Sequence, residues 1–317
     1  MTIALFRAAT PHARRDGSSS QKSSLLSRIR ALVLLGGSVR PSHFTTGISR
    51  SVLDLPLELG RSVLDHWYLE AAELARSVAM DSLSARIVLD RSGPAPTLPV
   101  LEPNLGMTIE RDPYEFRGTA GILRDLCADY AVDDYIVVAS AAQVMLQPLA
   151  DLVWDMAATG AEASLVAHTD GTPTGLMLLK CATLRDVSPV GFVDLKEQAL
   201  PVIAQRHSVS VIHRTQPASA PIRTLEDYIR SLRLYHRSLR RLNDENPSTD
   251  PYAEDWNITF SVVEDPSAVG RDTLLYDSVV LSGGQVESGA VLVRSVVGPS
   301  ATVYRRRSVV DRLVMGR

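Results

Sequence analysis

"LVLLGGSVRP", residues 32–41, reads as a buried β-strand that runs directly into a pair of glycines. Four consecutive aliphatic residues ahead of Gly36 are typical of a strand in a sheet that is covered on both faces. Glycines at the end of such a strand let the backbone approach a phosphate closely. This turn is short, since only Ser38 and Val39 separate the glycine pair from Arg40. The stretch therefore predicts an α/β fold and raises the question of whether its loop still holds a nucleotide.

Strand patterns alternate with helix patterns along most of the chain. Runs of β-branched and aliphatic residues predict strands at 85–90, 135–140, 162–168, 174–180 and 208–214. Apolar residues at helical spacing predict helices at 62–78, 118–131, 148–161, 195–207 and 224–242. Residues 91–106 are rich in Pro and Gly and are expected to form a loop. The alternation predicts a Rossmann-like, doubly wound and mostly parallel sheet with helices on both faces.

The C-terminal stretch repeats aliphatic residues at intervals of six. Val280, Val286 and Leu292 keep this interval, and a second series at 291, 297, 303 and 309 keeps it with a displacement of one residue. Such a period, with glycines between, is typical of hexapeptide coils that stack into a β-helix, and an antiparallel hairpin is the competing interpretation. The expected organisation is a disordered tail at 1–28, an α/β domain at 29–241, a polar linker at 242–257 and a short left-handed β-helix at 258–317.

Charge and composition argue against several classes of partner. The chain has 317 residues, a net charge of −3 and no apolar run of the roughly 18 residues that a membrane helix needs. Five arginines lie in the predicted helix at 224–242, but no aromatic stacking platform accompanies them, so a solvated or subunit-facing helix is expected. The two cysteines do not suggest a disulfide framework. We expect a cytoplasmic protein with neither a nucleic-acid partner nor a membrane partner.

Four stretches together resemble one known family. They are "ALVLLGGSVRP", "LGRSVLDHWYLEA", "FRGTAGILRD" and "VGFVDLKEQALPVIA". Their order, together with the C-terminal repeat, resembles the sugar-phosphate nucleotidyltransferases, or NDP-sugar pyrophosphorylases, and especially the mannose-1-phosphate guanylyltransferase-like branch. The resemblance covers about residues 29–317. It implies a reaction in which a sugar 1-phosphate attacks an NTP in line and releases pyrophosphate, with Mg²⁺ neutralising the anions.

The resemblance also assigns roles to residues of this chain. It implies that the triphosphate loop corresponds to Gly36, Gly37, Ser38 and Arg40, and that Arg50 stands where the family has a lysine. The nucleoside would lie against Gly118, Thr119, Ala120 and Gly121, for which a tight helix N-terminus is the structural alternative. The sugar would face Asp194, Lys196 and Glu197, for which the alternative is a solvated helix start. His66 and Trp67 are expected to pack in a helix and not to bind a ligand.

The sequence departs from the family pattern at each chemical position. The loop lacks the third glycine and the threonine of the family's Gly-Gly-x-Gly-Thr-Arg. The family holds its metal with two aspartates, one at the end of the strand that corresponds to 135–140 and one just before the last helix. The corresponding segments here, 139–143 and 220–223, contain no carboxylate. Mg²⁺ usually binds one or two carboxylates together with phosphates, so we predict no metal ligand in this chain.

The prediction is therefore a sugar-nucleotidyltransferase-like protein with impaired catalysis. Such a protein would bind a nucleotide, a nucleotide sugar or a sugar phosphate, and it would act as a regulatory or scaffolding subunit of a homo- or hetero-oligomer in polysaccharide or glycoconjugate biosynthesis. The alternative is an active pyrophosphorylase with a relocated Mg²⁺ site, in which Arg40 and Arg50 clamp the phosphates. A GT-A glycosyltransferase is less favoured, because no Asp-x-Asp follows a suitable strand.

Overall fold

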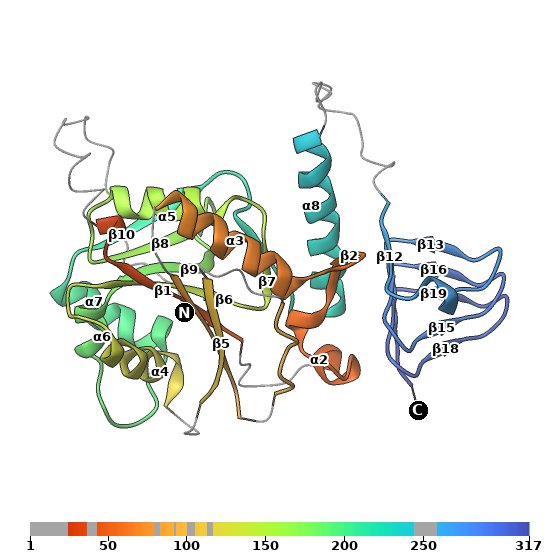
Figure 1. Ribbon diagram of the computed structural model, residues 1–317, viewed down its shortest axis with the longest axis horizontal. Coiled ribbons are helices and arrows are strands. Elements are labelled where there is room, and N and C mark those ends of the chain that lie inside the picture. Colours follow the sequence, from red (N-terminus) through yellow and green to blue (C-terminus); the bar gives the residue numbers. More distant parts are fainter. Residues whose placement is uncertain are drawn as a thin grey trace.

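The computed structural model describes residues 25–36, 43–78, 83–91, 93–99, 105–112, 117–243 and 259–316, without the side chains of 43 and 240–243. A seven-stranded sheet forms the centre of the N-terminal part (Figure 1). Its order is β10 (Val209–Arg214), β8 (Ala163–His168), β9 (Pro173–Lys180), β6 (Tyr135–Ser140), β1 (Ile29–Leu35), β4 (Leu83–Leu89) and β5 (Leu105–Arg111). Only β9 runs antiparallel to its neighbours in this sheet, so the prediction of a mostly parallel sheet is confirmed.

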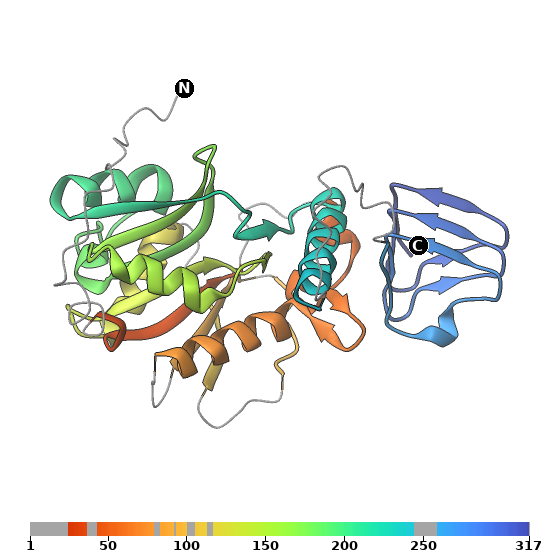
Figure 2. The same cartoon turned by 90° about the horizontal axis from the view of Figure 1, so that it is seen from above.

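Helices cover both faces of the sheet, as Figures 1 and 2 show. One core contains residues of α3 (Val63–Ser77), α5 (Leu149–Ala158) and α8 (Leu225–Asn243). The other contains residues of α4 (Gly118–Leu126), α6 (Cys181–Arg185) and α7 (Leu200–Arg206). Leu32 and Leu34 of β1 belong to the first core, and Ala31 and Val33 belong to the second. The opening aliphatic run is continuous because this strand is buried on both faces.

Two expectations about the chain's local structure need correction. The predicted loop at 91–106 ends in β5, an edge strand in which buried Leu105 and Met107 alternate with exposed Gly106 and Thr108. Pro and Gly upstream obscured this alternation in the sequence. Leu25 and Leu26 lie in the first core, so these two residues do not belong to the predicted tail.

The predicted helix at 195–207 is divided into two helical segments of different geometry. A π-helical turn, η3 (Leu195–Ala199), precedes α7, and Pro201 lies in the first turn of α7. Proline is tolerated there because the first N–H groups of a helix have no intrahelical acceptor. The π-helical turn begins directly after Asp194, which is its N-cap.

The C-terminal part consists of short parallel strands that repeat every 17 residues. One sheet contains β12 (Ser261–Val263), β14 (Ser278–Val280), β17 (Val296–Val297) and β20 (Leu313–Val314). A second contains β13 (Leu274–Tyr276), β16 (Val291–Val293) and β19 (Ser308–Val310), and a third pairs β15 (Gln285–Val286) with β18 (Thr302–Val303). All of these pairs are parallel, which contradicts the hairpin alternative.

The 17-residue repeat explains the displacement in the valine pattern. The apolar cluster inside this part contains Val280, Val286, Leu292, Val297 and Val303, with Val309 and Val314 packed against it. Successive members are therefore six, six and five residues apart. One repeat consists of three strands, and the inward-facing apolar residues of successive strands are six, six and five residues apart. Every third interval is therefore five residues long and breaks the period of six. The same spacing extends upstream to Val263, Val269 and Leu275, beyond the stretch where the sequence predicts it.

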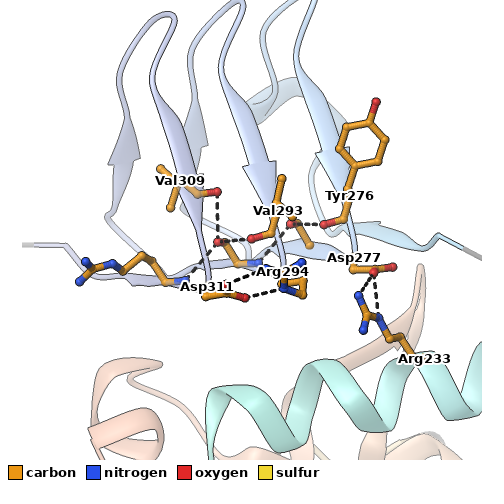
Figure 3. A network of polar contacts seen from close by, with 10 residues as sticks. Arg233, Tyr276, Asp277, Val293, Arg294, Val309 and Asp311 are labelled. Atoms are coloured by element: carbon orange, nitrogen blue, oxygen red, sulfur yellow. Dashed lines mark hydrogen bonds and ion pairs between the residues drawn. The ribbon is translucent and has the colours of Figure 1, made fainter. Parts of the chain in front are cut away.

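Left-handed backbone conformations recur at the corners of the repeat. Asp277, Arg294 and Asp311 lie 17 residues apart, and all three have φ between +46° and +52°. Figure 3 shows these residues in one row, where Arg294 forms a bidentate ion pair with Asp311 (2.6 and 2.7 Å). Asp277 at the other end of the row pairs with Arg233 of α8. Charge alternates along the row, which favours the stacking of the repeats.

Helix α8 lies between the two parts of the chain (Figures 1 and 2). Its Arg233 donates from Nε to Asp277 Oδ2 over 2.8 Å, and its His236 ring stacks on Phe260 at 5.4 Å between centroids. The first core continues into the C-terminal part through Val279 and Val296. Arg233 therefore joins the two parts of the chain by an ion pair, a partner that the expectation of a solvated or subunit-facing helix did not include. Among the described residues, no helix combines the length and apolarity needed to cross a bilayer.

Candidate functional site

The sheet has a topological switch point between β1 and β6. The chain adds β4 and β5 on one side of β1 and then crosses to place β6 on its other side. Ligands of open α/β sheets bind in the crevice at the carboxyl ends of the strands at such a point. Here Gly36 follows β1, and residues 141 and 142 follow β6. Gly36 thus lies at the position where this architecture binds ligands.

Backbone hydrogen bonds hold the end of β6 in place. Ala141 N donates to Leu35 O over 2.9 Å, and the indole Nε1 of Trp67 donates to Ala141 O over 3.0 Å. Gly36 N donates to Val88 O over 2.8 Å, and a Cβ atom on Gly36 would lie 2.9 Å from the Leu89 side chain. A larger residue at position 36 would therefore require the end of the Leu89 side chain to move. The other residues of the predicted loop, Gly37, Ser38 and Arg40, lie outside the described residues.

A short antiparallel ladder brings together the two segments where the family resemblance places metal aspartates. Strand β7 (Gln143–Met145) pairs with β11 (Ser219–Pro221), and Ile222 N donates to Ala142 O over 2.8 Å. The ladder joins residues about 75 positions apart, and the sequence pattern contained no signal for either strand. It places Arg223 beside the end of β6.

The side chains in these two segments do not fit a magnesium site. Ser140 ends the strand and Ala141 and Ala142 follow it, and the segment of Ile222 and Arg223 lies beside them. Mg²⁺ needs hard anionic oxygen ligands, and a guanidinium beside the site would repel it. Within the described part of the chain, no group of three or more His, Cys, Asp or Glu side chains could hold a metal ion.

Two other predicted segments are in direct contact. Gly118 has φ +70°, and Ala120 N donates to Val193 O over 3.1 Å. Leu195 N donates to Thr119 Oγ1 over 3.0 Å. The segment 118–121 and the segment beginning at Asp194 therefore form one wall, as the assignment of both to a single site requires. Gly118 begins helix α4, so the alternative of a tight helix N-terminus describes its backbone equally well.

The three polar residues predicted to face the sugar differ in their surroundings. Asp194 Oδ1 accepts hydrogen bonds from Lys196 N (2.8 Å) and Glu197 N (2.9 Å), which makes Asp194 the cap of η3. Lys196 and Glu197 are exposed. Desolvation of its ammonium group lowers the pKa of Lys196, and the positive charge of Arg223 lowers it further, whereas the carboxylate of Asp194 raises it. The assignment of Asp194, Lys196 and Glu197 to the sugar stays a prediction.

Arg50 is engaged with the C-terminal part of the chain. Its two terminal nitrogens donate to the carboxylate of Glu264 over 3.1 and 2.7 Å. These bonds form the planar, bidentate geometry that arginine makes with carboxylates. The structure thus supplies a partner for Arg50 other than phosphate, although its proposed role as a phosphate clamp stays a prediction. Sequence alone gave no signal for this pair, whose members are 214 residues apart.

His66 and Trp67 are packed as expected, and both also bind the backbone after β6. Trp67 is fully buried, and His66 Nε2 lies 3.1 Å from Met145 O. Burial lowers the pKa of His66 to about 4. The ring is therefore neutral at pH 7 and donates from Nε2 to the carbonyl. Neither residue is a ligand-binding group by this geometry, but both hold the segment that borders the crevice.

Acidification should destabilise the protein through His66. In the unfolded chain this side chain takes up a proton below about pH 6.5, whereas in the fold it stays neutral until about pH 4. The unfolded state then binds more protons, so stability falls as the pH falls. Between pH 7 and pH 5 we expect the free energy of unfolding to drop by about 2 kcal/mol through this group. Urea unfolding at the two pH values, in the natural protein and in His66→Gln, measures this contribution.

His207 provides a control, because its contribution to stability should change with pH in the opposite direction. Although burial lowers its pKa, hydrogen bonds to Asp186 and Glu162 raise it overall. Its contribution to stability is present at low pH and is lost as the pH rises through its folded-state pKa. His207→Gln should therefore steepen the loss of stability on acidification, while His66→Gln should flatten it. Equal pH profiles for the natural protein and His66→Gln would contradict the assignment.

The sheet order and the switch point define an open, doubly wound α/β protein, a class that binds ligands at the carboxyl ends of its strands. HddC from Yersinia pseudotuberculosis, solved also with GMP-PN, has 12% identity and a TM-score of 0.44, over 65% of this chain and 99% of its own. A putative glucose-1-phosphate thymidylyltransferase from Bacillus anthracis, in complex with a sucrose, has 12% identity and a TM-score of 0.47, over 69% and 97%.

A third solved structure is the homologue of Mycobacterium tuberculosis rv0371c from Mycobacterium sp. strain JC1. It has 17% identity and a TM-score of 0.45, over 68% of this chain and 98% of its own. No protein-family model matches the chain, and no curated protein matches it. The function of the chain therefore has to be inferred from its own sequence and from the geometry of its crevice.

Proposed function

We propose that this chain is a sugar-nucleotidyltransferase-like protein that binds a nucleotide sugar at the switch point and has little nucleotidyl-transfer activity. The single observation that carries the proposal is the β7–β11 ladder. It joins the two segments that should hold a metal, and neither segment has a carboxylate. The close backbone packing of Gly118 against Val193 supports the assignment of this segment to the site.

The electrostatic stabilisation that is lost with the two metal-binding carboxylates is large enough to predict weak catalysis. An NTP and a sugar phosphate together bring about six negative charges into one crevice, and Mg²⁺ normally offsets much of this charge. Loss of one electrostatic group of this kind costs roughly 10² to 10³ in rate. With both carboxylates replaced, turnover should be very slow, whereas binding of a less charged nucleotide sugar needs fewer counter-charges.

The C-terminal part suggests an assembly role. We infer that residues 259–316 form a three-sided left-handed β-helix, joined to an α/β domain by a connection within 244–258. A protein of this kind would act as a regulatory or scaffolding subunit in polysaccharide or glycoconjugate biosynthesis, within a homo- or hetero-oligomer. Mannose is the sugar that the family resemblance favours. A cytoplasmic location is consistent with this role.

A thermal-shift panel and a turnover assay test the proposed function together. We expect one of GDP-mannose, UDP-glucose, dTDP-glucose or ADP-glucose to stabilise the protein, by about 2.7 kcal/mol at ~100 times its dissociation constant. Incubation with each NTP, mannose 1-phosphate or glucose 1-phosphate and Mg²⁺ should release pyrophosphate at least about 10²-fold more slowly than an active pyrophosphorylase assayed in parallel.

The rival proposal is an active pyrophosphorylase with a relocated metal site and with Arg40 and Arg50 as phosphate clamps. Robust pyrophosphate release in the same assay would favour it and would overturn the proposal of impaired catalysis. The ion pair of Arg50 with Glu264 argues against the rival, because a clamp would first have to break two charge-assisted hydrogen bonds. Absence of a thermal shift with every nucleotide sugar would overturn the binding proposal.

A further inference from the structure

Within the described range 259–316, the third sheet of the C-terminal part lacks a strand from the first repeat. It contains β15 and β18, whereas the other two sheets contain four and three strands. One repeat before β15, the chain forms a 3₁₀ turn, η4 (Pro266–Ala268). Proline has no N–H to donate to a sheet, and Asp265 Oδ1 accepts from Ser267 N over 2.9 Å, so this segment forms a turn and not a strand. Val269 then rejoins the sheet through a parallel bridge to Val286.

The turn that replaces this strand forms one wall of an open hollow. The hollow has a volume of about 550 Å³, which lies within the range of roughly 300 to 1,000 Å³ for small-molecule sites. A Cβ atom on Gly270 in its lining would lie 2.5 Å from Ser288 N, so the glycine lets the first two repeats approach closely there. Three successive repeats contribute polar side chains to the lining, and these are Ser267, Gln285, Glu287, Ser288 and Arg305.

The polar groups of the hollow are available to a ligand. Glu287 Oε2 accepts a hydrogen bond from Arg305 N over 2.8 Å, which holds this carboxylate in place. Among the described residues, the exposed side chains of Gln285 and Arg305 have no hydrogen-bond or ion-pair partner. Glu287 and Arg305 contribute one negative and one positive charge, so the lining has no net charge. Hydroxyl, amide, carboxylate and guanidinium groups together offer both donors and acceptors.

We propose that this hollow is a binding site for a neutral saccharide. Each hydroxyl group of a sugar both donates and accepts hydrogen bonds, which matches the mixed donors and acceptors and the zero net charge of the lining. Tyr304, which is 65% exposed, follows β18 and continues its register beside Glu287, where it offers an apolar ring with a polar hydroxyl. The site lies in the part of the chain beyond α8 (Figures 1 and 2), so it does not depend on the proposed nucleotide binding.

Calorimetric titration of the full chain with maltose, cellobiose, mannobiose, glucose and glucuronic acid tests the proposal. We expect at least one of the neutral sugars to bind, with a dissociation constant that changes less than about twofold between roughly 50 and 500 mM NaCl, because a neutral ligand has no charge to screen. Glucose and glucuronic acid differ only in a carboxylate. Glucuronic acid that binds tenfold tighter than glucose would show an anion site and would overturn the proposal, as would the absence of binding by every neutral sugar.

Matched variants locate the bound sugar. Arg305→Ala should weaken binding about tenfold, and Gln285→Ala about threefold or more, because each removes a hydrogen-bonding group from the lining. Arg307 is an exposed arginine outside the lining, and Arg307→Ala should change the dissociation constant less than about twofold. Thermal melting of the three variants without sugar should match that of the natural protein. Equal effects of Arg305→Ala and Arg307→Ala, or unchanged binding in Gln285→Ala and Arg305→Ala, would place the sugar elsewhere and overturn the proposal.

Discussion

Replacement of Gly118 by alanine should destabilise the protein by about 3 kcal/mol or more, through two separate causes. Gly118 has φ +70°, a conformation that costs an L-residue roughly 1 to 2 kcal/mol. An added Cβ atom would also lie 2.6 Å from the carbonyl carbon of Val193 and 2.9 Å from its nitrogen. These are backbone atoms, so the contact cannot be relieved by a change of rotamer. Urea unfolding monitored by circular dichroism measures the effect.

Substitutions at two other glycines separate the conformational cost from the steric cost. Gly60 has φ +78° with nothing within 4 Å of its would-be Cβ atom, so Gly60→Ala should show the conformational cost alone, about 1 kcal/mol. Gly106 lies in β5 with an ordinary φ and open space, and Gly106→Ala should stabilise by about 0.5 kcal/mol. If Gly118→Ala cost no more than Gly60→Ala, the close contact with Val193 would be refuted.

The same substitution should also affect the site. Val193 lies between Gly118 and Asp194, and Leu195 N is bonded to Thr119 Oγ1. A displaced Val193 would therefore move the wall of the crevice that contains both predicted segments. We expect the thermal shift with a nucleotide sugar to be reduced in Gly118→Ala and unchanged in Gly60→Ala. If Gly118→Ala were destabilised but still bound the nucleotide sugar normally, the ligand would have to bind elsewhere on the protein.

The sequence predicted the parts of the fold whose signals are local. Aliphatic runs identified β1 and β6, and the six-residue period identified the C-terminal repeat. Short strands such as β7 and β11 were missed because three residues carry too little periodicity, and their pairing depends on tertiary contacts. The contact of Gly118 with Val193 and the ion pair of Arg50 with Glu264 are likewise products of the folded chain. Arg223 was visible only as a missing aspartate, since its position beside the end of β6 requires the β7–β11 ladder.

Removal of the Trp67 side chain should cost about 4 kcal/mol. Among the described residues, Trp67 is the largest fully buried side chain, and it lies in the core between α3 and the sheet. Trp67→Ala loses apolar burial and leaves a cavity, and it also leaves Ala141 O without the indole donor. Trp154 on α5 is 41% exposed, so Trp154→Ala is a matched control that should cost less than about 1 kcal/mol. Chemical denaturation of both variants, monitored by circular dichroism, gives the two free energies.

The more conservative Trp67→Phe separates packing from positioning. Phenylalanine keeps most of the apolar surface but cannot donate a hydrogen bond, so the buried carbonyl of Ala141 loses its side-chain donor at a cost of about 1 to 2 kcal/mol. Because Ala141 and Ala142 border the crevice, and Ala142 O also accepts from Ile222 N, the substitution should loosen the segment that positions Arg223. We therefore expect Trp67→Phe to weaken nucleotide-sugar binding, although Trp67 is fully buried and touches no ligand itself. Unchanged binding, together with the expected loss of stability, would show that this hydrogen bond serves the core alone.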